Sequence, residues 1–309
     1  MGKGKKTSKT QKKSSESRLF NFARDSYFER TSRPIYAIVF LLPFIVFYEI
    51  GTFRINTDIL NQSRIRVVAF VWMQNLLELL GFGGKLAWIA PPLAVLVILV
   101  ALQLTSGKPW RFWFGDIVPM VAECILLAVP LIVLTLFLSS SAGSQANMER
   151  YTNDWAAIPT ASFPAHPPTG VYSSVSLAAG QGNDITNRYL LANIITGIGA
   201  GIYEELVFRL VLICLLMLLF QDALKLTHVN AIVLAVLISA ALFSAHHHVD
   251  FFSGRLNSVD PFNVTKFIFR TIAGIYFAAL FAIRGFGITA GTHAFYNIIA
   301  VSITARFFQ

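Results

Sequence analysis

The sequence predicts an all-α, polytopic membrane protein of about seven or eight transmembrane helices. Of the 309 residues, 55% are hydrophobic and only 13% are charged, whereas an ordinary soluble domain has about 25% charged residues. Apolar runs of about 20 residues, the length that spans a bilayer as a helix, recur along the chain. The formal net charge of +9 does not indicate nucleic acid as a partner, because ten Lys or Arg and only three acidic residues lie in the first 33 residues.

Residues 1–33 form the first expected part of the chain. Their start, "MGKGKKTSKTQKKSSESR", is poor in apolar residues and rich in Lys and Ser, which predicts a solvated, disordered arm. The positive-inside rule places this arm in the cytoplasm; attraction to anionic lipid headgroups is the alternative reason for its charge. No small-residue cleavage site follows the first apolar run, so we expect that run to remain as an anchor.

Six apolar segments have the length of a span, and a seventh is longer. They are residues 34–53, 86–104, 115–138, 229–247, 262–283 and 287–305, with the long run at 189–221. The segment 66–82 contains three polar residues, which favours an interfacial or re-entrant helix. Counting spans from a cytoplasmic tail places Lys108, Arg111, Lys225 and Arg284 on the cytoplasmic side, as the charge rule requires.

Residues 139–188 are rich in Ser, Ala, Pro and Gly and predict a long extramembrane loop. This loop divides an N-terminal set of transmembrane helices, 34–138, from a second set, 189–309, which contains the polar residues suited to chemistry.

The stretch "GIYEELVFRL" places two carboxylates and a guanidinium in an apolar segment, where unpaired charge is expensive. In a helix, Glu205 and Arg209 lie four residues apart with the acid first, the favourable order for an ion pair. Glu204 is rotated about 100° from Glu205, so the same arginine does not easily serve both. A spare buried carboxylate is suited to act as a general base, although all three residues can also simply join helices through ion pairs.

Two later segments contain further polar side chains. In "ALFSAHHHVD", Phe243 and His247 lie four residues apart, and three adjacent histidines point in different directions, so at most two serve one site. In "GTHAFYNIIA", His293 and Asn297 have the same spacing and can act as helix-to-helix hydrogen bonds. One carboxylate, two imidazoles and a carboxamide together suit the activation of water and the stabilisation of an oxyanion.

These residues resemble the CAAX protease and bacteriocin-processing (Abi) family of intramembrane peptidases, which includes the type II CAAX prenyl endopeptidases. The family pattern EExxxR, FxxxH and HxxxN reads here, in order, as Glu204-Glu205 with Arg209, Phe243 with His247, and His293 with Asn297. The resemblance covers about residues 189–305. It implies a helical membrane endopeptidase with a conical intramembrane active-site cavity, in which Glu204 activates water.

The resemblance also implies roles for the other motif residues. His247 helps to hold the water, Glu205 and Arg209 orient the base, and His293 and Asn297 donate to the oxyanion. The neighbouring His246 is the alternative catalytic imidazole if the helix register shifts. Such enzymes have been described both as glutamate-type proteases and as metalloproteases. We favour no metal and no other cofactor, because the positive charge of Arg209 opposes a dication; the alternative is zinc held by Glu204, His247 and His293.

His247 and His293 are predicted to lie at different depths in the membrane if each span is a regular helix. His247 lies about 27 Å into its span and His293 about 9 Å into its own. The two side chains can meet only if one span begins or ends elsewhere than predicted, or if a segment between them is re-entrant. We expect irregular helix near 248–266.

The sequence therefore predicts an endopeptidase that cuts a membrane peptide or a lipidated protein in the bilayer, with CAAX-type proteins among the candidate substrates. It does not indicate a nucleic-acid partner. We expect it in the plasma (inner) membrane of a prokaryote. The alternative is a non-catalytic immunity or scaffold protein of the same fold, and a third is a transporter or proton relay. The substrate and the oligomeric state are not specified by the sequence.

Overall fold

The computed structural model describes residues 25–58, 63–83, 88–141, 160–164, 182–249, 251 and 262–307. The predicted N-terminal arm, up to residue 24, lies outside the described residues, as does most of the segment 248–266. The described chain is all-α apart from one pair of short strands, which confirms the predicted fold class.

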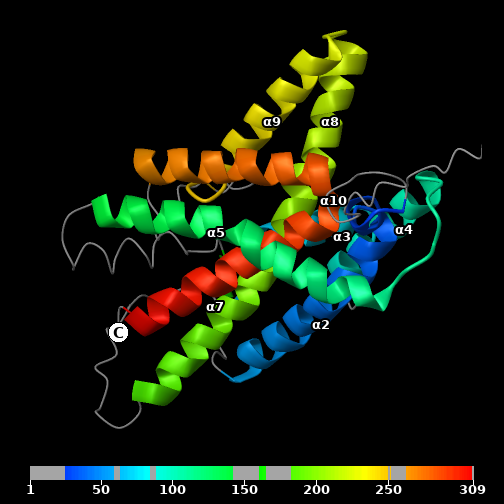
Figure 1. Ribbon diagram of the computed structural model, residues 1–309. Coiled ribbons are helices and arrows are strands. Elements are labelled where there is room, and N and C mark those ends of the chain that lie inside the picture. Colours follow the sequence, from blue (N-terminus) through cyan, green and yellow to red (C-terminus); the bar gives the residue numbers. More distant parts are fainter. Residues whose placement is uncertain are drawn as a thin grey trace, which may run out of the picture.

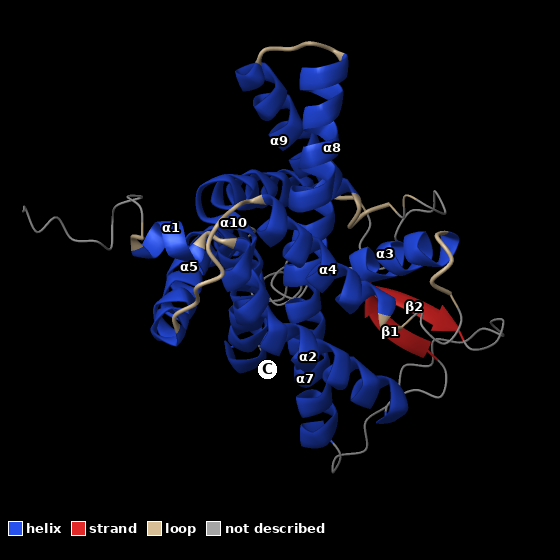
Figure 2. Cartoon of the chain, turned by 90° about the vertical axis from the view of Figure 1, so that its right-hand side faces the viewer, coloured by secondary structure: helices blue, strands red, loops and turns tan. Residues whose placement is uncertain are grey.

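The N-terminal half contains four main helices and the first strand. The elements are α1 (Tyr27–Thr31), α2 (Pro34–Asp58), β1 (Ser63–Val67), α3 (Val68–Leu79), α4 (Ala90–Thr105), the 3₁₀ turn η2 (Phe114–Asp116) and α5 (Ile117–Ser141). The predicted interfacial segment 66–82 thus begins at the end of a strand and continues as the helix α3. Strand β1 pairs antiparallel with β2 (Thr160–Pro164), with Ser63 opposite Pro164, beside α3 (Figure 2).

The C-terminal half is built around one long helix. It consists of α7 (Gly182–Glu205), the π-helical segment η3 (Leu206–Leu212), α8 (Ile213–Met217) and a second π-helical segment η4 (Leu218–Ala223). α9 (His228–Ala245) and α10 (Val264–Phe307) follow. The stretch 139–188, predicted as a loop, therefore contains the last residues of α5, strand β2 and the first turns of α7.

Five helices of the described chain are long and apolar enough to cross a membrane. They are Pro34–Ile55, Phe114–Leu138, Leu190–Ala223, His228–Ala245 and Val264–Ile303, while α3 and α4 are shorter apolar helices. The last of the five contains both predicted spans 262–283 and 287–305. Each of the seven predicted spans overlaps a helix of the described chain: five long helices overlap six of the predicted spans, and the shorter α4 overlaps the predicted span 86–104.

Gly285 separates α10 into two arms. Its φ of 74° and ψ of 179° are not helical, and a positive φ of this kind favours glycine. The carbonyl oxygen of Ser32 would lie 3.1 Å from a Cβ at this position, so the corner packs directly against the chain after α1. Figure 1 shows the arm before Gly285, in orange, and the arm after it, in red, running away from this corner in the same general direction.

The corner of α10 is fixed by ion pairs to neighbouring elements. Arg284 contacts Glu123 on α5 at 2.8 Å (Nη2 to Oε2) and donates to the carbonyl of Phe28 on α1 at 2.8 Å. Lys108 contacts Glu29 on α1 at 2.9 Å. Lys108 and Arg284, which were predicted to share one side of the membrane with the N-terminal tail, therefore both contact the helix that follows this tail.

The second arm of α10 packs closely on α7. A Cβ on Gly201 would lie 2.5 Å from the backbone nitrogen of Ala294 and 2.9 Å from the carbonyl oxygen of Ala290. Only a glycine permits this backbone-to-backbone distance, as is common where transmembrane helices cross. The crossing lies one turn before Glu204 and Glu205 and beside His293, so it brings these side chains to one level.

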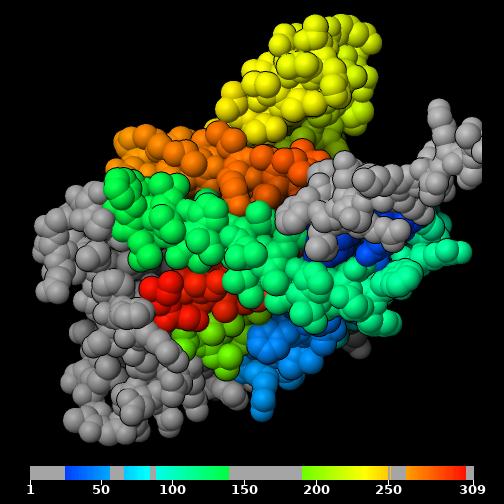
Figure 3. Space-filling model, viewed as in Figure 1, coloured from blue at the N-terminus to red at the C-terminus, as the bar shows by residue number. Residues whose placement is uncertain are grey.

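The α8–α9 hairpin removes the depth conflict between the two histidines. Figures 1 and 3 show this hairpin standing clear of the other helices, and α8 has no buried residue. α9 starts at the tip of the hairpin, which lies farther from the site than the corner at Gly285 does. The 18 residues of α9, about 27 Å, and the eight residues from Gly285 to His293 therefore end at the same level.

Candidate active site

The site is centred on the two carboxylates at the end of α7. Glu204 and Glu205 are 1% and 0% exposed, although they lie in an apolar helix. The π-helical segment η3 begins at the next residue, Leu206, and single π-helical turns inside α-helices often occur at functional sites. The wider π turn changes the direction of the side chains that follow the two carboxylates.

Glu205 connects an arginine to a histidine. Its Oε2 lies 3.1 Å from Nε of Arg209, and its Oε1 lies 2.8 Å from Nδ1 of His293. Arg209 is fully buried, so its charge requires a counter-charge. The predicted pair of Glu205 and Arg209 is therefore present, and the same carboxylate also orients the imidazole of the second arm of α10.

Aromatic rings and a backbone carbonyl complete the surroundings of Arg209. The guanidinium carbon lies 4.2 Å from the ring centre of Phe243 and 5.6 Å from that of Phe277, and Nη2 donates to the carbonyl of Gly274 at 3.3 Å. These cation–π contacts give the phenylalanine of the FxxxH motif a physical role. Phe277 also stacks on the ring of His293, with centroids 4.5 Å apart and planes at 19°.

Glu204 is left to face two imidazoles. Its Oε1 lies 3.6 Å from Nε2 of His246, and its Oε2 lies 3.9 Å from Nε2 of His293. Within the described chain, neither Oε1 of Glu204 nor Nε2 of His246 has a hydrogen-bond partner, although both atoms are buried. Buried polar atoms normally have a partner. Oε2 of Glu205 and Nε and Nη1 of Arg209 also lack a hydrogen-bond partner in the described chain, so the surroundings of both carboxylates are suited to a polar reactant.

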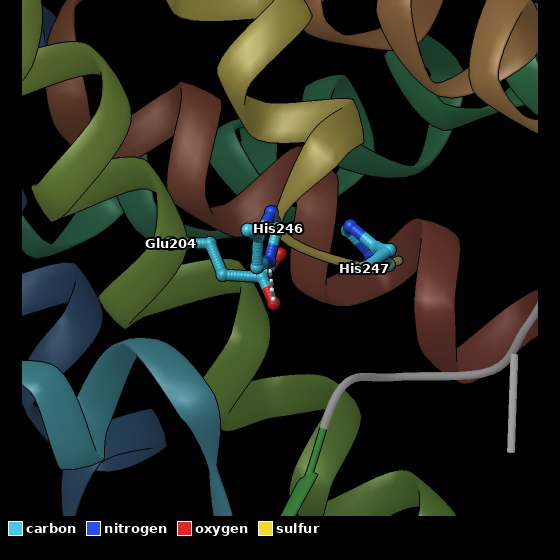
Figure 4. A group of neighbouring side chains, drawn as sticks. All are labelled: Glu204, His246 and His247. Atoms are coloured by element: carbon cyan, nitrogen blue, oxygen red, sulfur yellow. Dashed lines mark ion pairs between the residues drawn. The ribbon is translucent and has the colours of Figure 1, made fainter. Parts of the chain in front are cut away.

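His246 and His247 lie just beyond the end of α9. That helix ends at Ala245, and residues 246–248 form a turn, so the helical-face argument for Phe243 and His247 does not apply directly. Nδ1 of both imidazoles contacts the carbonyl oxygen of Phe243, at 3.0 Å for His247. Figure 4 shows the Glu204 carboxylate extended towards the ring of His246, with the ring of His247 to the side.

Three of these groups could hold a metal ion. Glu204, His246 and His247 each offer one ligand atom, and these atoms all lie within 4.8 Å of one another. Tetrahedral zinc ligands are about 3.3 Å apart, from metal–ligand bonds of about 2.0–2.1 Å, so the three side chains fit zinc after a small contraction. His293, the third ligand of the predicted zinc set, is not part of this group.

Asn297 makes a contact between helices. Its Nδ2 donates to the carbonyl of Gly197 on α7 at 3.1 Å, one turn along α10 from His293. The contact leaves one amide hydrogen and the side-chain oxygen for other partners. Of the six predicted site residues, Glu204, Glu205, Arg209 and His293 thus form one connected group, His247 lies beside it, and Asn297 ties α10 to α7.

Sequence reasoning did not predict the aromatic surroundings of His246. Its ring lies 5.6 Å from Trp72 of α3 and 4.8 Å from Phe208 of η3. Phe208 belongs to the charged stretch, but nothing in the sequence of α3 indicates a contact with a residue 174 positions away. Such contacts depend on how the two halves pack.

Fold and site together define an integral membrane protein with an acid–imidazole site buried among its helices. Residues 186–299 match the sequence model of the type II CAAX prenyl endopeptidase Rce1-like family. The chain therefore carries a domain of this family, and the predicted resemblance is confirmed. No curated protein and no solved structure gave a significant match to the chain.

Proposed function

We propose that the protein is an intramembrane endopeptidase that hydrolyses a peptide bond of a membrane-associated, CAAX-type substrate with water activated by Glu204. The observation that carries this proposal is the buried Oε1 of Glu204, which has no hydrogen-bond partner in the described chain and faces an imidazole nitrogen at 3.6 Å. The family of the matched domain supports the class of reaction. The bilayer supplies the setting, because the helices that carry the site are apolar and long enough to span it.

Glu204 is the general base of the proposed reaction. Its carboxylate takes a proton from a water molecule as the water oxygen attacks the carbonyl carbon of the scissile bond. The tetrahedral intermediate then collapses, and the proton passes to the leaving amine. Glu204 is suited to this role because Arg209 is paired with Glu205 and does not neutralise it.

His293 and Glu205 form the second part of the mechanism. Glu205 accepts a hydrogen bond from Nδ1 of His293, which orients the ring, as a carboxylate does for a catalytic histidine elsewhere. In the proposed mechanism the imidazolium form of His293 donates from Nε2 to the oxyanion. The free amide hydrogen of Asn297 is the second predicted donor.

The metal-free mechanism is our proposal, and zinc is its alternative. A zinc ion would supply a Lewis acid and an activated water, held by Glu204, His246 and His247. The neighbouring guanidinium of Arg209 opposes a dication. Metal analysis of the purified, active protein separates the two possibilities.

We also propose that the N-terminus faces the cytoplasm. The basic tail precedes α1, and α1 contacts Lys108 and Arg284, so positive residues from three separate parts of the chain gather at one end of the helices. This arrangement follows the positive-inside rule.

The substitution Glu204→Gln tests the proposed function. Glutamine keeps the shape of the side chain but cannot take a proton, so kcat on a quenched farnesylated peptide with a CAAX end should fall by about 10²–10⁴-fold, with an unchanged melting temperature in detergent. Glu78→Gln is the matched control, because Glu78 lies on α3 and contacts Gln74 at 3.0 Å. Unchanged cleavage by Glu204→Gln would exclude the mechanism and favour the non-catalytic alternative.

A further inference from the structure

The two adjacent histidines after α9 differ in what they face. Nε2 of His246 points at Oε1 of Glu204, 3.6 Å away, whereas the ring of His247 packs against that of His246, with centroids 4.0 Å apart and planes at 65°. The family pattern FxxxH selects His247 by its spacing from Phe243. The turn that follows Ala245 instead brings the preceding imidazole against the base.

The separation of Oε1 of Glu204 and Nε2 of His246, 3.6 Å, suits one bridging water oxygen. A water oxygen beside the line that joins these two atoms can lie about 2.8 Å, a normal hydrogen-bond distance, from both of them. There it donates one hydrogen to the carboxylate and the other to the imidazole, and it leaves a lone pair for attack. Both facing atoms lack a hydrogen-bond partner in the described chain, so each can accept a hydrogen bond from this water. Because both atoms are buried, the two side chains must separate slightly to admit it.

The orientation of His246 is fixed from two sides. Its Nδ1 contacts the carbonyl of Phe243, which leaves Nε2 directed at Glu204. The indole of Trp72 meets the imidazole edge to face, with centroids 5.6 Å apart and planes at 66°, and Phe208 packs at 4.8 Å. Trp72 is in turn stacked on Phe251 at 5.5 Å. The imidazole therefore lies in an aromatic enclosure with few alternative rotamers.

We propose that His246, rather than the motif residue His247, is the imidazole that holds the attacking water against Glu204, and that Trp72 of α3 positions it. This proposal rests on the proposed function and adds a catalytic residue to it. Trp72 is a positioning residue, because it acts through His246. α3 lies outside the matched segment 186–299, so the N-terminal half completes the site.

The first experiment compares His246→Gln with His247→Gln in detergent, on the same quenched farnesylated peptide. We expect His246→Gln to lower kcat by about 100-fold with KM changed by less than about threefold. His247→Gln should lose less than about tenfold, because His246, at 3.6 Å from Glu204, still holds the water directly in this variant. A loss in His247→Gln that equals or exceeds that in His246→Gln would overturn the proposal, and melting temperatures identify variants that do not fold.

The second experiment tests Trp72 by a double-mutant cycle. Trp72→Ala should lower kcat by about tenfold and Trp72→Phe by less, since an aromatic ring still packs on the imidazole. In the His246→Gln background, Trp72→Ala should lower kcat no further. Leu79→Ala is the control on the same helix, because Leu79 is 83% exposed, and it should leave kcat unchanged. Equal, additive losses in both backgrounds would show that Trp72 only stabilises the fold and would overturn its role.

The Glu204→Gln variant separates the two proposals. If Glu204→Gln is inactive while His246→Gln is fully active, the endopeptidase reading stands and the role of His246 fails. If Glu204→Gln is as active as the unsubstituted protein, the proposed function itself fails, and the role of His246 fails with it.

Discussion

Removing the charge of Glu205 should destabilise the protein strongly, and the structure gives the reason. Arg209 is 0% exposed, and its Nε lies 3.1 Å from Oε2 of Glu205. In Glu205→Gln the guanidinium keeps the carbonyl of Gly274 and the faces of Phe243 and Phe277 but loses its ion-pair partner. His293 loses the anionic acceptor of its Nδ1 hydrogen bond at the same time.

The expected magnitude is that of a buried ion pair with one partner removed, about 3–5 kcal/mol. The two rings stabilise the guanidinium by about 2 kcal/mol, as a desolvated cation–π contact does, but they do so equally before and after the substitution, so they do not reduce the expected loss. A loss of about 3 kcal/mol lowers the ratio of folded to unfolded protein by more than about 100-fold. Arg209→Met should destabilise as well, because it leaves the carboxylate of Glu205 buried without the guanidinium.

The double variant Glu205→Gln with Arg209→Met provides the sharpest test. The double variant leaves no buried charge without its partner, so it should lose less stability than either single variant, with a coupling energy of at least about 2 kcal/mol. The measurement is reversible unfolding by SDS in mixed micelles, followed by tryptophan fluorescence. Additive losses in the cycle, or a loss below about 1 kcal/mol in Glu205→Gln, would refute the reasoning that Glu205 is the counter-charge of Arg209.

Two further predictions concern the helix crossing and the ion pairs of α1. Gly201→Ala should lower stability by about 1–3 kcal/mol and reduce kcat, because the new Cβ would lie 2.5 Å from the backbone nitrogen of Ala294 and would push α7 away from α10. Gly115→Ala is the neutral control, since a Cβ at Gly115 would have nothing within 4 Å. Equal melting temperatures of the two variants would contradict the close crossing. Hydrogen bonds from Arg33 and Lys108 lower the pKa of Glu29 to about 2, so its stabilising contribution is present above about pH 4.5, the ordinary value, and is lost as the pH falls towards 2. Glu29→Gln should therefore lower the melting temperature at pH 7 by an amount that shrinks below pH 4.5, and a constant difference across the pH range would contradict this.

The spanning helices could be predicted because their signal is local. A run of about 20 apolar residues must form a helix in a bilayer, where every backbone group needs an internal hydrogen bond. The break between the predicted spans 262–283 and 287–305 is found at Gly285. The same reasoning does not predict the pairing of β1 with β2, because the partners Ser63 and Pro164 are about 100 residues apart.

The polar residues of the site could be predicted, but only part of their arrangement. The four-residue spacing predicted the ion pair of Glu205 with Arg209, since helix geometry alone places residues four apart on one face. It did not show that His246 faces Glu204, because α9 ends at Ala245 and the directions of the next side chains follow from the turn. Contacts such as that of Trp72 with His246 depend on packing between distant helices.

The different environments of the two adjacent glutamates follow from one constraint. A single guanidinium, fully buried, lies 3.1 Å from Oε2 of Glu205 as an ion-pair partner, and His293 donates a hydrogen bond to Oε1 of that carboxylate. Glu204, rotated by about 100° on the same helix, is directed instead at the Nε2 atoms of two imidazoles. The neutralisation of Arg209 by Glu205 is therefore what leaves Glu204 available as a base. A substitution that frees Arg209 should lower the activity of Glu204 even where the protein still folds, since the guanidinium would then compete for its carboxylate.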